Sequence, residues 1–493
     1  MQGFKEKSFT AGQMAEDMFR APTHYGMRVL DRSKFQKFVQ LKAARVLDNK
    51  NISKIRQQLE RSKDILQQER LASIQPDPDT ELAKAGRKCI LLRPEVATAN
   101  VSPTPETNGA ANGNHANQSA EPRPHSSTVS ELVNQNLISV IPFTVHLTYP
   151  YWTYHDIISS ILPPDEQGEI PSGFQQVGHV AHLNLRDGYL KHKTLIAQIL
   201  MHKNPSVRTV INKIDDVGEE SEYRTFKYEV LAGPDDMHVT ISEEGCTFKF
   251  DYSKVYWNSR LNTEHRRIVE SFKPGEAVCD VMAGIGPFAV PAGKRGCFVY
   301  ANDLNPESFA CLEDAVKRNK VGGYVKAFNE DGRDFIKRAV RELATTDSEV
   351  KITTKLSKKE LGAKSEVVRT TKAPKHFQHF VLNLPASAVT FLSSFVGVYA
   401  QLSVKEQLSS LSRAEMPLIH VYTFSTKSDN NVAEGYKICE NISEQLGHEM
   451  KPGKIDVDGD AAVEIFDVRD VAPKKRMFCA SFRLPREVAF RLD

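Results

Sequence analysis

The stretch VCDVMAGIGPFAVPA, residues 278–292, carries two closely spaced glycines directly after an apolar run with the composition of a buried strand. Glycine permits a tight turn and lets a ligand approach the backbone, so Gly284 and Gly286 suit a ligand-binding loop. In open α/β sheets, ligands bind in the crevice outside the carboxyl ends of the strands. The stretch therefore predicts a nucleotide-type cofactor at the carboxyl end of a sheet.

The chain around this loop alternates between strand-like and helix-like segments. Helices are predicted after Gly286, in PESFACLEDAVKRNK and in GRDFIKRAVREL. The strands predicted between and beyond them are AVCDVMA, FVYANDL, VKAFNED, HFVLNL and LIHVYTFS. This alternation indicates a parallel, doubly wound sheet, so we expect an α/β fold.

The glycine loop by itself is compatible with two cofactors. Gly284 to Ala289 matches the dinucleotide fingerprint, and Asp303 follows Gly284 by nineteen residues, near the distance expected of a ribose-binding acid. Pro287, however, removes a backbone N–H where a dinucleotide site would present donors to the pyrophosphate. S-adenosylmethionine has no phosphate, so the loop favours this cofactor over NAD, and a dehydrogenase remains an alternative.

Three successive predicted strands end in an aspartate. Asp280 suits the cationic methionine moiety of S-adenosylmethionine, and Asp303 suits its ribose hydroxyls. Asp331, followed by Gly332, could accept a hydrogen bond from the adenine amino group. Each acid alone could equally be a helix N-cap, but three such strand ends together favour a shared pocket.

Composition changes along the chain predict four regions. Residues 96–134 are rich in Asn, Ala, Ser, Pro and Gly and predict a disordered linker. Residues 1–95 are expected to form a small N-terminal α/β accessory domain, and residues 135–258 a mixed α/β middle domain. Residues 259–493 are expected to form the domain with the doubly wound sheet.

A basic insert is expected within the last region, at residues 345–376. Residues 351–376 hold seven Lys and one Arg against two Glu, a net charge of +6, with little apolar periodicity. The insert is either a solvated disordered segment or a flexible arm that contacts phosphates.

The whole chain of 493 residues carries 65 basic and 62 acidic residues, a formal net charge of +3. Any nucleic-acid surface must therefore come from local clusters, of which residues 191–203, Arg266 with Arg267, and residues 474–476 are candidates. The seven cysteines are scattered and form no CxxC pair, which argues against a disulfide framework or a zinc site. We also expect no membrane span, because no apolar run reaches the required length.

The fourth predicted strand ends in NLPA, residues 383–386, which resembles the Asn/Asp-Pro-Pro-aromatic element of nucleic-acid methyltransferases. Further segments carry a wider resemblance: VGHVAHLNLRD (177–187), YRTFKYEVLAG (223–233), FDYSKVYWNSRLNTEHRRI (250–268) and the glycine loop. Together they resemble the eukaryotic and archaeal tRNA (guanine-37 N1)-methyltransferase family, from about residue 135 to the C-terminus. Residues 20–95 resemble the N-terminal tRNA-docking domain of fungal members.

The resemblance implies a class I, Rossmann-like methyltransferase domain fused to a middle domain that completes the catalytic pocket. It also implies a monomer that methylates N1 of guanosine 37 in tRNA with S-adenosylmethionine and supports reading-frame maintenance. A location in the cytoplasm, the nucleus and the mitochondrial matrix is implied by the family and not by the N-terminus.

The resemblance also assigns roles to single residues. Glu264 matches the proposed general base, Arg224 the arginine that contacts the target guanine, and Asn383 the asparagine near the transferred methyl group. The cofactor site would be lined by His265, Asp303, Leu304, Asp331 and Gly332. Guanine N1 carries a proton and is a poor nucleophile until that proton leaves. A carboxylate would accept the proton, and an arginine would stabilise the negative charge that develops on the guanine.

Other interpretations stay open. Glu264 could be a helix N-terminal carboxylate stabilised by the macrodipole, and Arg224 an exposed strand residue. His179 and His182 would point to opposite faces of a strand, so we expect no metal site there. Tyr223, Tyr256 and Trp257 could stack on a base or belong to a core. The alternative functions are a wybutosine-synthesising aminocarboxypropyl transferase and a non-catalytic tRNA-binding protein.

Overall fold

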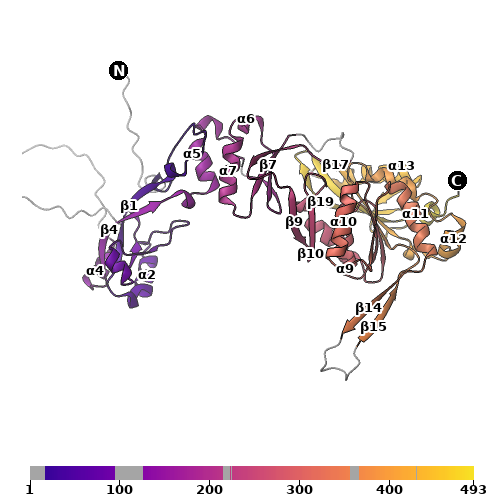
Figure 1. Cartoon of the computed structure of the whole chain (residues 1–493), viewed down its shortest axis with the longest axis horizontal. Coiled ribbons are helices and arrows are strands. Elements are labelled where there is room, and N and C mark those ends of the chain that lie inside the picture. The colour runs from indigo at the N-terminus through magenta and orange to yellow at the C-terminus, as the bar shows by residue number, and fades with distance from the viewer. Residues whose placement is uncertain are drawn as a thin grey trace, which may run out of the picture. The chain divides into compact units, whose positions relative to one another are not determined.

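A computed structural model describes residues 17–94, 126–171, 173–214, 223, 225–355, 366–428 and 430–492. The chain divides into two compact units, each shown in Figure 1. The first contains residues 1–172 and 186–204, and the second contains residues 173–185 and 205–493. The two are described separately below.

The first unit is built on a four-stranded antiparallel sheet in the order β2-β3-β1-β4. Its strands are β1 (Lys37–Val46), β2 (Ile74–Pro76), β3 (Lys88–Leu91) and β4 (Ile138–Leu147). Helices α2 (Ile52–Arg61) and α4 (Ser127–Asn134) pack apolar side chains against it, among them Ile55, Leu59 and Leu132. The unit also contains α3 (Thr80–Lys84), α5 (Tyr154–Ile161), α6 (Asp187–Leu190) and α7 (Lys193–Lys203).

The first sheet corrects the expected boundary at residue 135. Strand β4 pairs with β1 along its whole length, from Lys37 opposite Leu147 to Val46 opposite Ile138. The pairing satisfies the backbone groups of an edge of β1 that would otherwise be exposed. Residues 138–147 therefore belong to the N-terminal sheet and not to a separate middle domain. Helix α4 likewise occupies the end of the expected linker, whose residues 96–125 lie outside the described residues.

The second unit begins with two small sheets. One has the order β5-β6-β7-β8 and the other is the hairpin β9–β10. The strands are β5 (Gln175–Val177), β6 (Val180–Leu183), β7 (Thr209–Lys213), β8 (Tyr228–Ala232), β9 (His238–Glu243) and β10 (Cys246–Asp251). Apolar residues of the hairpin, such as Val239 and Phe248, share a core with α8 (Asn262–Ser271) of the following domain. The expected middle domain is thus divided between the two units.

The main sheet of the second unit has eight strands in the order β13-β12-β11-β16-β17-β20-β19-β18. Its strands are β11 (Ala277–Asp280), β12 (Phe298–Asn302), β13 (Val325–Phe328), β16 (His379–Leu382), β17 (Leu418–Thr426), β18 (Lys451–Pro452), β19 (Ala462–Ala472) and β20 (Lys475–Arg483). The five strands from β13 to β17 are parallel, and β20 runs antiparallel to β17. This arrangement confirms the predicted parallel, doubly wound sheet.

Helices cover both faces of this sheet, which gives three layers (Figure 1). One core contains residues of α8, α9 (Ala289–Lys294) and α10 (Pro306–Arg318). The other contains residues of α11 (Gly332–Thr345), α12 (Leu402–Leu408), α13 (Asn431–Leu446), α14 (Arg486–Ala489) and the 3-10 helix η7 (Ala388–Phe395). Strands β11, β12 and β16 are buried along their whole length, which explains why their sequences are almost continuously apolar.

The strand order reverses between β11 and β16. From β11 the chain continues to β12 and β13 on one side and then returns to β16 on the other. Such a reversal opens a crevice at the carboxyl ends of the strands. The glycine loop follows β11 and therefore lies at this crevice.

The basic insert contains two strands, β14 (Glu349–Lys355) and β15 (Glu366–Lys372), which pair antiparallel as a hairpin outside the main sheet (Figure 1). For these residues a hairpin replaces the expected disordered segment, because β-branched Val and Thr in both strands favour strand formation, and the alternative of an arm that contacts phosphates stays a prediction. Residues 356–365 of the insert lie outside the described residues.

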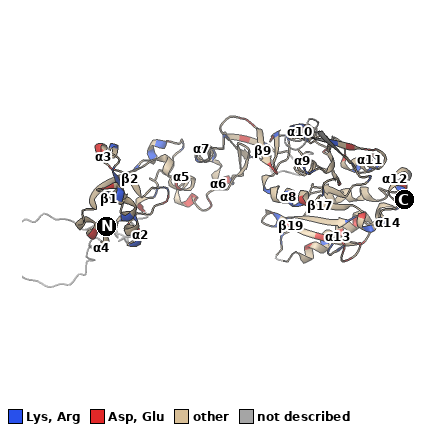
Figure 2. Cartoon of the chain, turned by 90° about the horizontal axis from the view of Figure 1, so that it is seen from below, with Lys and Arg blue, Asp and Glu red and all other residues tan. Residues whose placement is uncertain are grey.

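In Figure 2, the ribbon positions of basic and acidic residues are interspersed on both units, in keeping with the small net charge. Within the described ranges, no helix is both long enough and apolar enough to span a membrane.

Candidate functional site

A pocket lies at the carboxyl ends of the parallel strands, where the strand order reverses. It brings together predicted site residues from four successive strand ends: Gly284, Asp303, Leu304, Asp331, Gly332 and Asn383. Tyr223 and Tyr256, which were candidates for stacking, line the same pocket, and Trp257 is buried in the core. We call this cavity the strand-tip pocket.

Asn302, which the sequence reading missed, holds three of these strand ends together. Its side-chain amide donates to the carbonyl oxygens of Val281, at 3.1 Å, and of Glu330, at 3.0 Å. Its side-chain oxygen accepts from the backbone N–H of Glu330 at 2.9 Å. A buried amide that is fully hydrogen-bonded rigidifies its surroundings, so Asn302 fixes the shape of the pocket floor. The signal in the sequence was a polar residue inside an otherwise apolar strand.

The two glycines of the loop have different roles. Both have positive φ, +56° at Gly284 and +96° at Gly286. A Cβ at Gly286 would lie 2.7 Å from Cδ1 of Leu312, so this glycine allows the loop to pack against α10 and does not line the pocket. A Cβ at Gly284 would meet no protein atom within 4 Å. The backbone at Gly284 is therefore open to a ligand.

Asp303 shapes the loop and also lines the pocket. Its carboxylate accepts from the backbone N–H of Gly284 at 2.8 Å and of Asn305 at 3.0 Å. Burial raises the pKa of Asp303, and these two N–H donors oppose the shift. The side chain of the next residue, Leu304, is 45% exposed at the pocket and offers an apolar surface.

Asp331 fits both of its proposed interpretations. It is the N-cap of α11, because its carboxylate accepts from the backbone N–H of Arg333 at 2.8 Å, and it also lines the pocket. A Cβ at the neighbouring Gly332 would lie 3.0 Å from Phe391 and from Val281. A larger residue at 332 would therefore push Phe391, another pocket residue that the sequence reading missed, from its place.

Asp280 lies directly before the pocket residues Val281 and Met282 and is fully buried. Neither carboxylate oxygen makes a hydrogen bond of normal geometry to the part of the chain that the structure describes. Burial raises the pKa of Asp280 well above its usual range, the nearby Asp303 adds to the shift, and the backbone N–H of Ala289 only partly opposes it. Burial therefore favours the protonated form of Asp280, and a cation close to it would favour the ionised form.

Asn383 directly follows β16 and lines the strand-tip pocket. The turn after it is held by the carbonyl oxygen of Leu384, which accepts from the N–H groups of Ser387 at 2.8 Å and Ala388 at 2.7 Å. The half-buried side-chain amide of Asn383 makes no hydrogen bond to any described residue. It is therefore free to bind a ligand as both donor and acceptor.

Glu264 lies in the first turn of α8 and is only 4% exposed. Its carboxylate accepts two hydrogen bonds of 2.7 Å from the guanidinium of Arg267 and one of 2.7 Å from the hydroxyl of Tyr422. We call Glu264, Arg267 and Tyr422 the Glu264 cluster. Burial raises the pKa of Tyr422 well above its usual range, and the neighbouring Cys479 and Glu264 act in the same direction. Burial opposes ionisation of Arg267, but its hydrogen bonds to Glu264 raise its pKa overall.

Sheet register places this cluster beside the pocket. Leu382 of β16 pairs with Val421 of β17, so the next residues, Asn383 and Tyr422, follow at the same level of the sheet. Tyr422 thus lies one strand beyond Asn383, and Glu264 is held there by its hydrogen bond to Tyr422. Glu264 does not line the strand-tip pocket itself.

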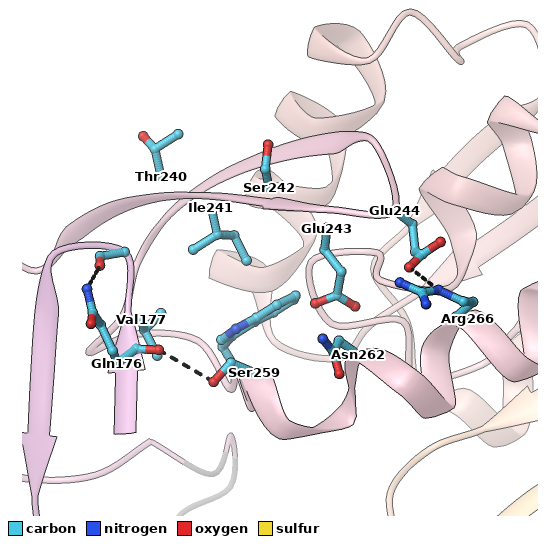
Figure 3. A pocket seen from close by; sticks show the side chains of 12 residues that line it. Gln176, Val177, Thr240, Ile241, Ser242, Glu243, Glu244, Ser259, Asn262 and Arg266 are labelled. Carbon is cyan, nitrogen blue, oxygen red and sulfur yellow. Dashed lines mark hydrogen bonds and ion pairs between the residues drawn. The ribbon is translucent and has the colours of Figure 1, made fainter. Parts of the chain in front are cut away.

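His265 does not line the strand-tip pocket either. Its Nδ1 lies 2.5 Å from the carboxylate of Glu243 on β9, and its ring packs edge-on against Phe288 at 4.8 Å between ring centroids. Glu243 lines a second pocket, formed by β9, the turn at Gly178 and the start of α8 (Figure 3). The described contacts of His265 therefore hold α8 to the β9–β10 hairpin, and its contact with a cofactor stays a prediction.

Arg224 lies outside the described residues. His179 contacts Asp236, with 3.2 Å between its Nε2 and a carboxylate oxygen, whereas the ring of His182 stacks on Phe226. Burial lowers the pKa of His182 to about 4. In the described ranges, no group of three or more His, Cys, Asp or Glu side chains is arranged to hold a metal ion.

Comparisons with known proteins agree with this geometry. A family model described as the TRM5/TYW2 methyltransferase domain matches residues 239–358, and one described as the TYW2 N-terminal domain matches residues 154–236. The chain is 49% identical over 495 residues to a tRNA (guanine(37)-N(1))-methyltransferase of Neurospora crassa, covering 99% of both proteins. It is also 49% identical over 478 residues to the protein of the same name from Fusarium vanettenii, covering 96% of this chain and 97% of the relative.

Solved structures show the same fold. The crystal structure of Trm5b from Pyrococcus abyssi superposes with a TM-score of 0.53 at 20% identity, covering 90% of this chain and 99% of that one. A structure described as the complex of aTrm5 and tRNALeu superposes with a TM-score of 0.52 at 17% identity, with the same coverage. At these identities the likeness supports the fold of the chain, and the residues of the site come from its own geometry.

Proposed function

The chain belongs to the tRNA (guanine(37)-N(1))-methyltransferase family, and from this premise we propose that it transfers a methyl group from S-adenosylmethionine to N1 of guanosine 37 in tRNA. The observation that carries the proposal is the strand-tip pocket, where side chains from four strand ends meet at the reversal of strand order. The pocket leaves polar groups unpartnered in the places where this cofactor would need them.

The residues of the pocket fit S-adenosylmethionine. Asp280 precedes the pocket residues Val281 and Met282, and its buried carboxyl group, which makes no hydrogen bond of normal geometry to described residues, would match the cationic methionine moiety. Asp303 and Asp331 offer acceptors for the ribose hydroxyls and the adenine amino group, and Leu304 and Phe391 offer apolar surface for the adenine ring. When bound, the cofactor supplies the electrophilic methyl group.

Glu264 is the proposed general base. Guanine N1 must lose its proton to become nucleophilic, and a carboxylate oxygen of Glu264 would accept it. Arg267 and Tyr422 fix the carboxylate with three hydrogen bonds, so its orientation is set before the substrate arrives. Arg224 would stabilise the negative charge that develops on the guanine O6 as the proton leaves.

The proposal is tested by transfer of a tritiated methyl group to unmodified tRNA transcripts that carry guanosine or adenosine at position 37. We expect labelling of the guanosine transcript only, and equal labelling of both would contradict methylation at guanine N1. Thermal stabilisation by S-adenosylhomocysteine but not by NAD is expected from the same preparation, because a ligand stabilises the protein whose folded state binds it.

A second candidate function is aminocarboxypropyl transfer, because the TYW2 N-terminal domain model matches residues 154–236. The two reactions use the same cofactor but move different carbons. Cofactor labelled in the methionine chain would label tRNA only in the aminocarboxypropyl reaction, whereas methyl-labelled cofactor would label it only in the methyl transfer.

We further propose, from the family alone, that the protein acts as a monomer and is present in the cytoplasm, the nucleus and the mitochondrial matrix. Light scattering after size-exclusion chromatography measures the oligomeric state, and fractionation of cells that express the tagged protein measures its location. A stable dimer, or absence from any of these compartments, would contradict the respective part of the proposal.

A further inference from the structure

Two arginines near the strand-tip pocket have no acidic partner among the described residues. Arg260 lies in the 3-10 helix η6 (Ser259–Leu261) just before α8 and is exposed. Arg469 lies in β19 and is half-buried, and its Nε donates only to the backbone carbonyl of Asp470, at 3.0 Å. A half-buried guanidinium without a carboxylate at ion-pair distance is unusual, since the charge has lost part of its water without gaining a directly bound counterion.

The acids closest to Arg469 in sequence are already used by other bases. Asp470 accepts from Lys427 at 2.6 Å and from Arg476 at 2.7 Å. Asp467 accepts from Arg476 at 2.8 Å. Among the described residues, Arg469 is therefore the basic side chain of this part of β19 that forms no direct ion pair.

Packing of α8 along β19 brings the two arginines to the same end of the sheet. The guanidinium of Arg267 lies 3.9 Å from the ring centroid of Phe466 and fixes the helix against the strand. From Arg267 back to Arg260 the chain rises about 10 Å at ~1.5 Å per helical residue. From Phe466 forward to Arg469 the strand rises about 10 Å at ~3.4 Å per residue. Because α8 runs opposite to the parallel strands, the path from Arg267 to Arg260 and the path from Phe466 to Arg469 both lead toward the carboxyl ends of those strands.

The electrostatics agree with this proximity. Burial lowers the pKa of Arg469 and the charge of Arg260 lowers it further, whereas Tyr256 and Asp470 act in the opposite direction. The phenol of Tyr256 interacts with Arg469 as well, and the same tyrosine lines the strand-tip pocket. The arginine pair is therefore next to the rim of the pocket.

The backbone of β19 is irregular on both sides of Arg469. Its pairing with β20 shifts register between Asp467 and Arg469 and again between Asp470 and Ala472. Such bulges redirect side chains and are frequent beside active sites. Here they flank the one unpaired arginine of the described part of β19.

We propose that Arg260 and Arg469 form a phosphate-binding site that holds a backbone phosphodiester of the substrate RNA next to the guanosine entering the strand-tip pocket. The site rests on the proposed function for its substrate. A phosphodiester supplies the missing negative charge, and guanidinium groups suit it because they donate paired hydrogen bonds to phosphate oxygens. Its role is to position the RNA backbone so that the target base reaches the pocket.

The first test compares RNA affinity and cofactor affinity in single variants. Arg260→Gln and Arg469→Gln should each weaken binding of a tRNA transcript with guanosine 37 about tenfold, the usual effect of losing one charged hydrogen-bonding contact. Each should also reduce the slope of log affinity against log salt by roughly 0.7 to 0.9, as expected for one phosphate contact. Affinity for S-adenosylhomocysteine and the melting temperature should not change.

Arg295→Gln is the matched control. Arg295 is another exposed arginine for which the described chain provides no ion pair, but it follows α9 at the amino end of β12, away from the strand tips. The variant removes the same charge and should keep the affinity and salt slope of the wild type. An equal loss in Arg295→Gln would show a nonspecific charge effect and overturn the site.

The second test identifies the phosphate. Transcripts are assembled by ligation with a neutral methylphosphonate at one position on either side of nucleotide 37. The modification that weakens binding to the wild type should have no further effect on the double variant Arg260→Gln/Arg469→Gln, because both contacts with that phosphate are already lost. The proposal is wrong if the loss of RNA affinity caused by the phosphonate adds to that caused by the arginine substitutions at every position. It is also wrong if both arginine variants bind RNA like the wild type. Methyl transfer by the wild type to the unmodified transcript is measured separately, so that a failure of the proposed function is distinguished from a failure of the phosphate site.

Discussion

The strand-tip pocket and the Glu264 cluster lie at neighbouring strand ends, but their polar groups are satisfied differently. Asn383 in the pocket, and Asp280 buried directly before the pocket residues, make no normal side-chain hydrogen bond to described residues. In the cluster, both oxygens of Glu264 are occupied by Arg267 and Tyr422. Open polar groups are available to a ligand, whereas the satisfied carboxylate is held in one orientation. This difference supports the proposal that the first region binds the cofactor and that the second holds the reacting group.

The largest effect is expected from Glu264→Gln, which removes the proposed base. Turnover should fall about 100- to 10,000-fold, the usual contribution of a general base, as measured by single-turnover methyl transfer. Affinity for S-adenosylhomocysteine should stay unchanged, because Glu264 does not line the pocket. Normal turnover in a folded variant would make Glu264 a structural helix residue and remove the distinction between the two regions. The melting temperature serves as the folding control, since loss of one partner leaves Arg267 partly unpaired.

Asp303→Asn should act on the other region. The carboxylate accepts two backbone N–H groups at 2.8 and 3.0 Å, and one amide oxygen cannot replace both acceptor atoms. We expect S-adenosylhomocysteine to bind about 10- to 100-fold more weakly by calorimetry, from the loss of charged hydrogen bonds. Turnover at saturating cofactor should change far less. A turnover defect with unchanged cofactor affinity would show that Asp303 acts in the reaction and not in cofactor binding, and would contradict the functional distinction between the two regions.

Tyr422→Phe sharpens the description of the cluster with a small change. It removes one of three hydrogen bonds to Glu264 and leaves both bonds from Arg267. Turnover should fall about fivefold, in line with roughly 1 kcal/mol for one hydrogen bond. Cofactor affinity should not change. A loss as large as that of Glu264→Gln would show that Tyr422 takes part in proton transfer and does not only position the carboxylate.

Asp280→Asn tests the pocket through the pH dependence of stability, where we expect the smallest effect. Because burial raises the pKa of Asp280, the folded protein keeps a proton that the unfolded chain has lost at pH values above the ordinary aspartate pKa of about 3.9. The free energy of unfolding of the ligand-free wild type should therefore fall as pH rises through that range. Asp280→Asn cannot titrate, so the melting temperature of the variant should fall less over the same range. If the melting temperatures of both proteins fell equally with pH, ionisation of Asp280 would not destabilise the folded protein, and the prediction would be wrong.

Cofactor binding gives a related control. A cationic ligand favours the ionised form of Asp280, so binding of S-adenosylmethionine to the wild type should release a proton. Calorimetry in two buffers with different ionisation enthalpies detects this release, which should be absent in Asp280→Asn.

Much of the pocket could be predicted from the sequence for a local reason. The apolar period places β11, β12, β13 and β16, and parallel strands bring their carboxyl ends to one edge. Gly284, Asp303, Asp331 and Asn383 each follow such a strand, so their meeting required no knowledge of distant packing. Gly286 belonged to the same motif, but whether it faced a ligand or α10 depended on tertiary contacts.

Contacts between distant segments could not be predicted from the sequence. The bond between Tyr422 and Glu264 joins residues 158 positions apart and depends on β17 lying beside β16, which no spacing encodes. The same holds for β4, which pairs with β1 across a long intervening segment and moved the expected domain boundary.

The sequence by itself determined the parallel sheet, the glycine loop and the acidic strand ends, because these follow from local periodicity and backbone preference. Only the tertiary structure decided which polar side chains have partners. Glu264 is hydrogen-bonded, whereas Asp280 makes no normal hydrogen bond and Arg469 no direct ion pair to described residues, because of the neighbours that other elements supply. Hydrogen bonding and burial act between surfaces that the fold brings together, and a linear pattern does not contain them.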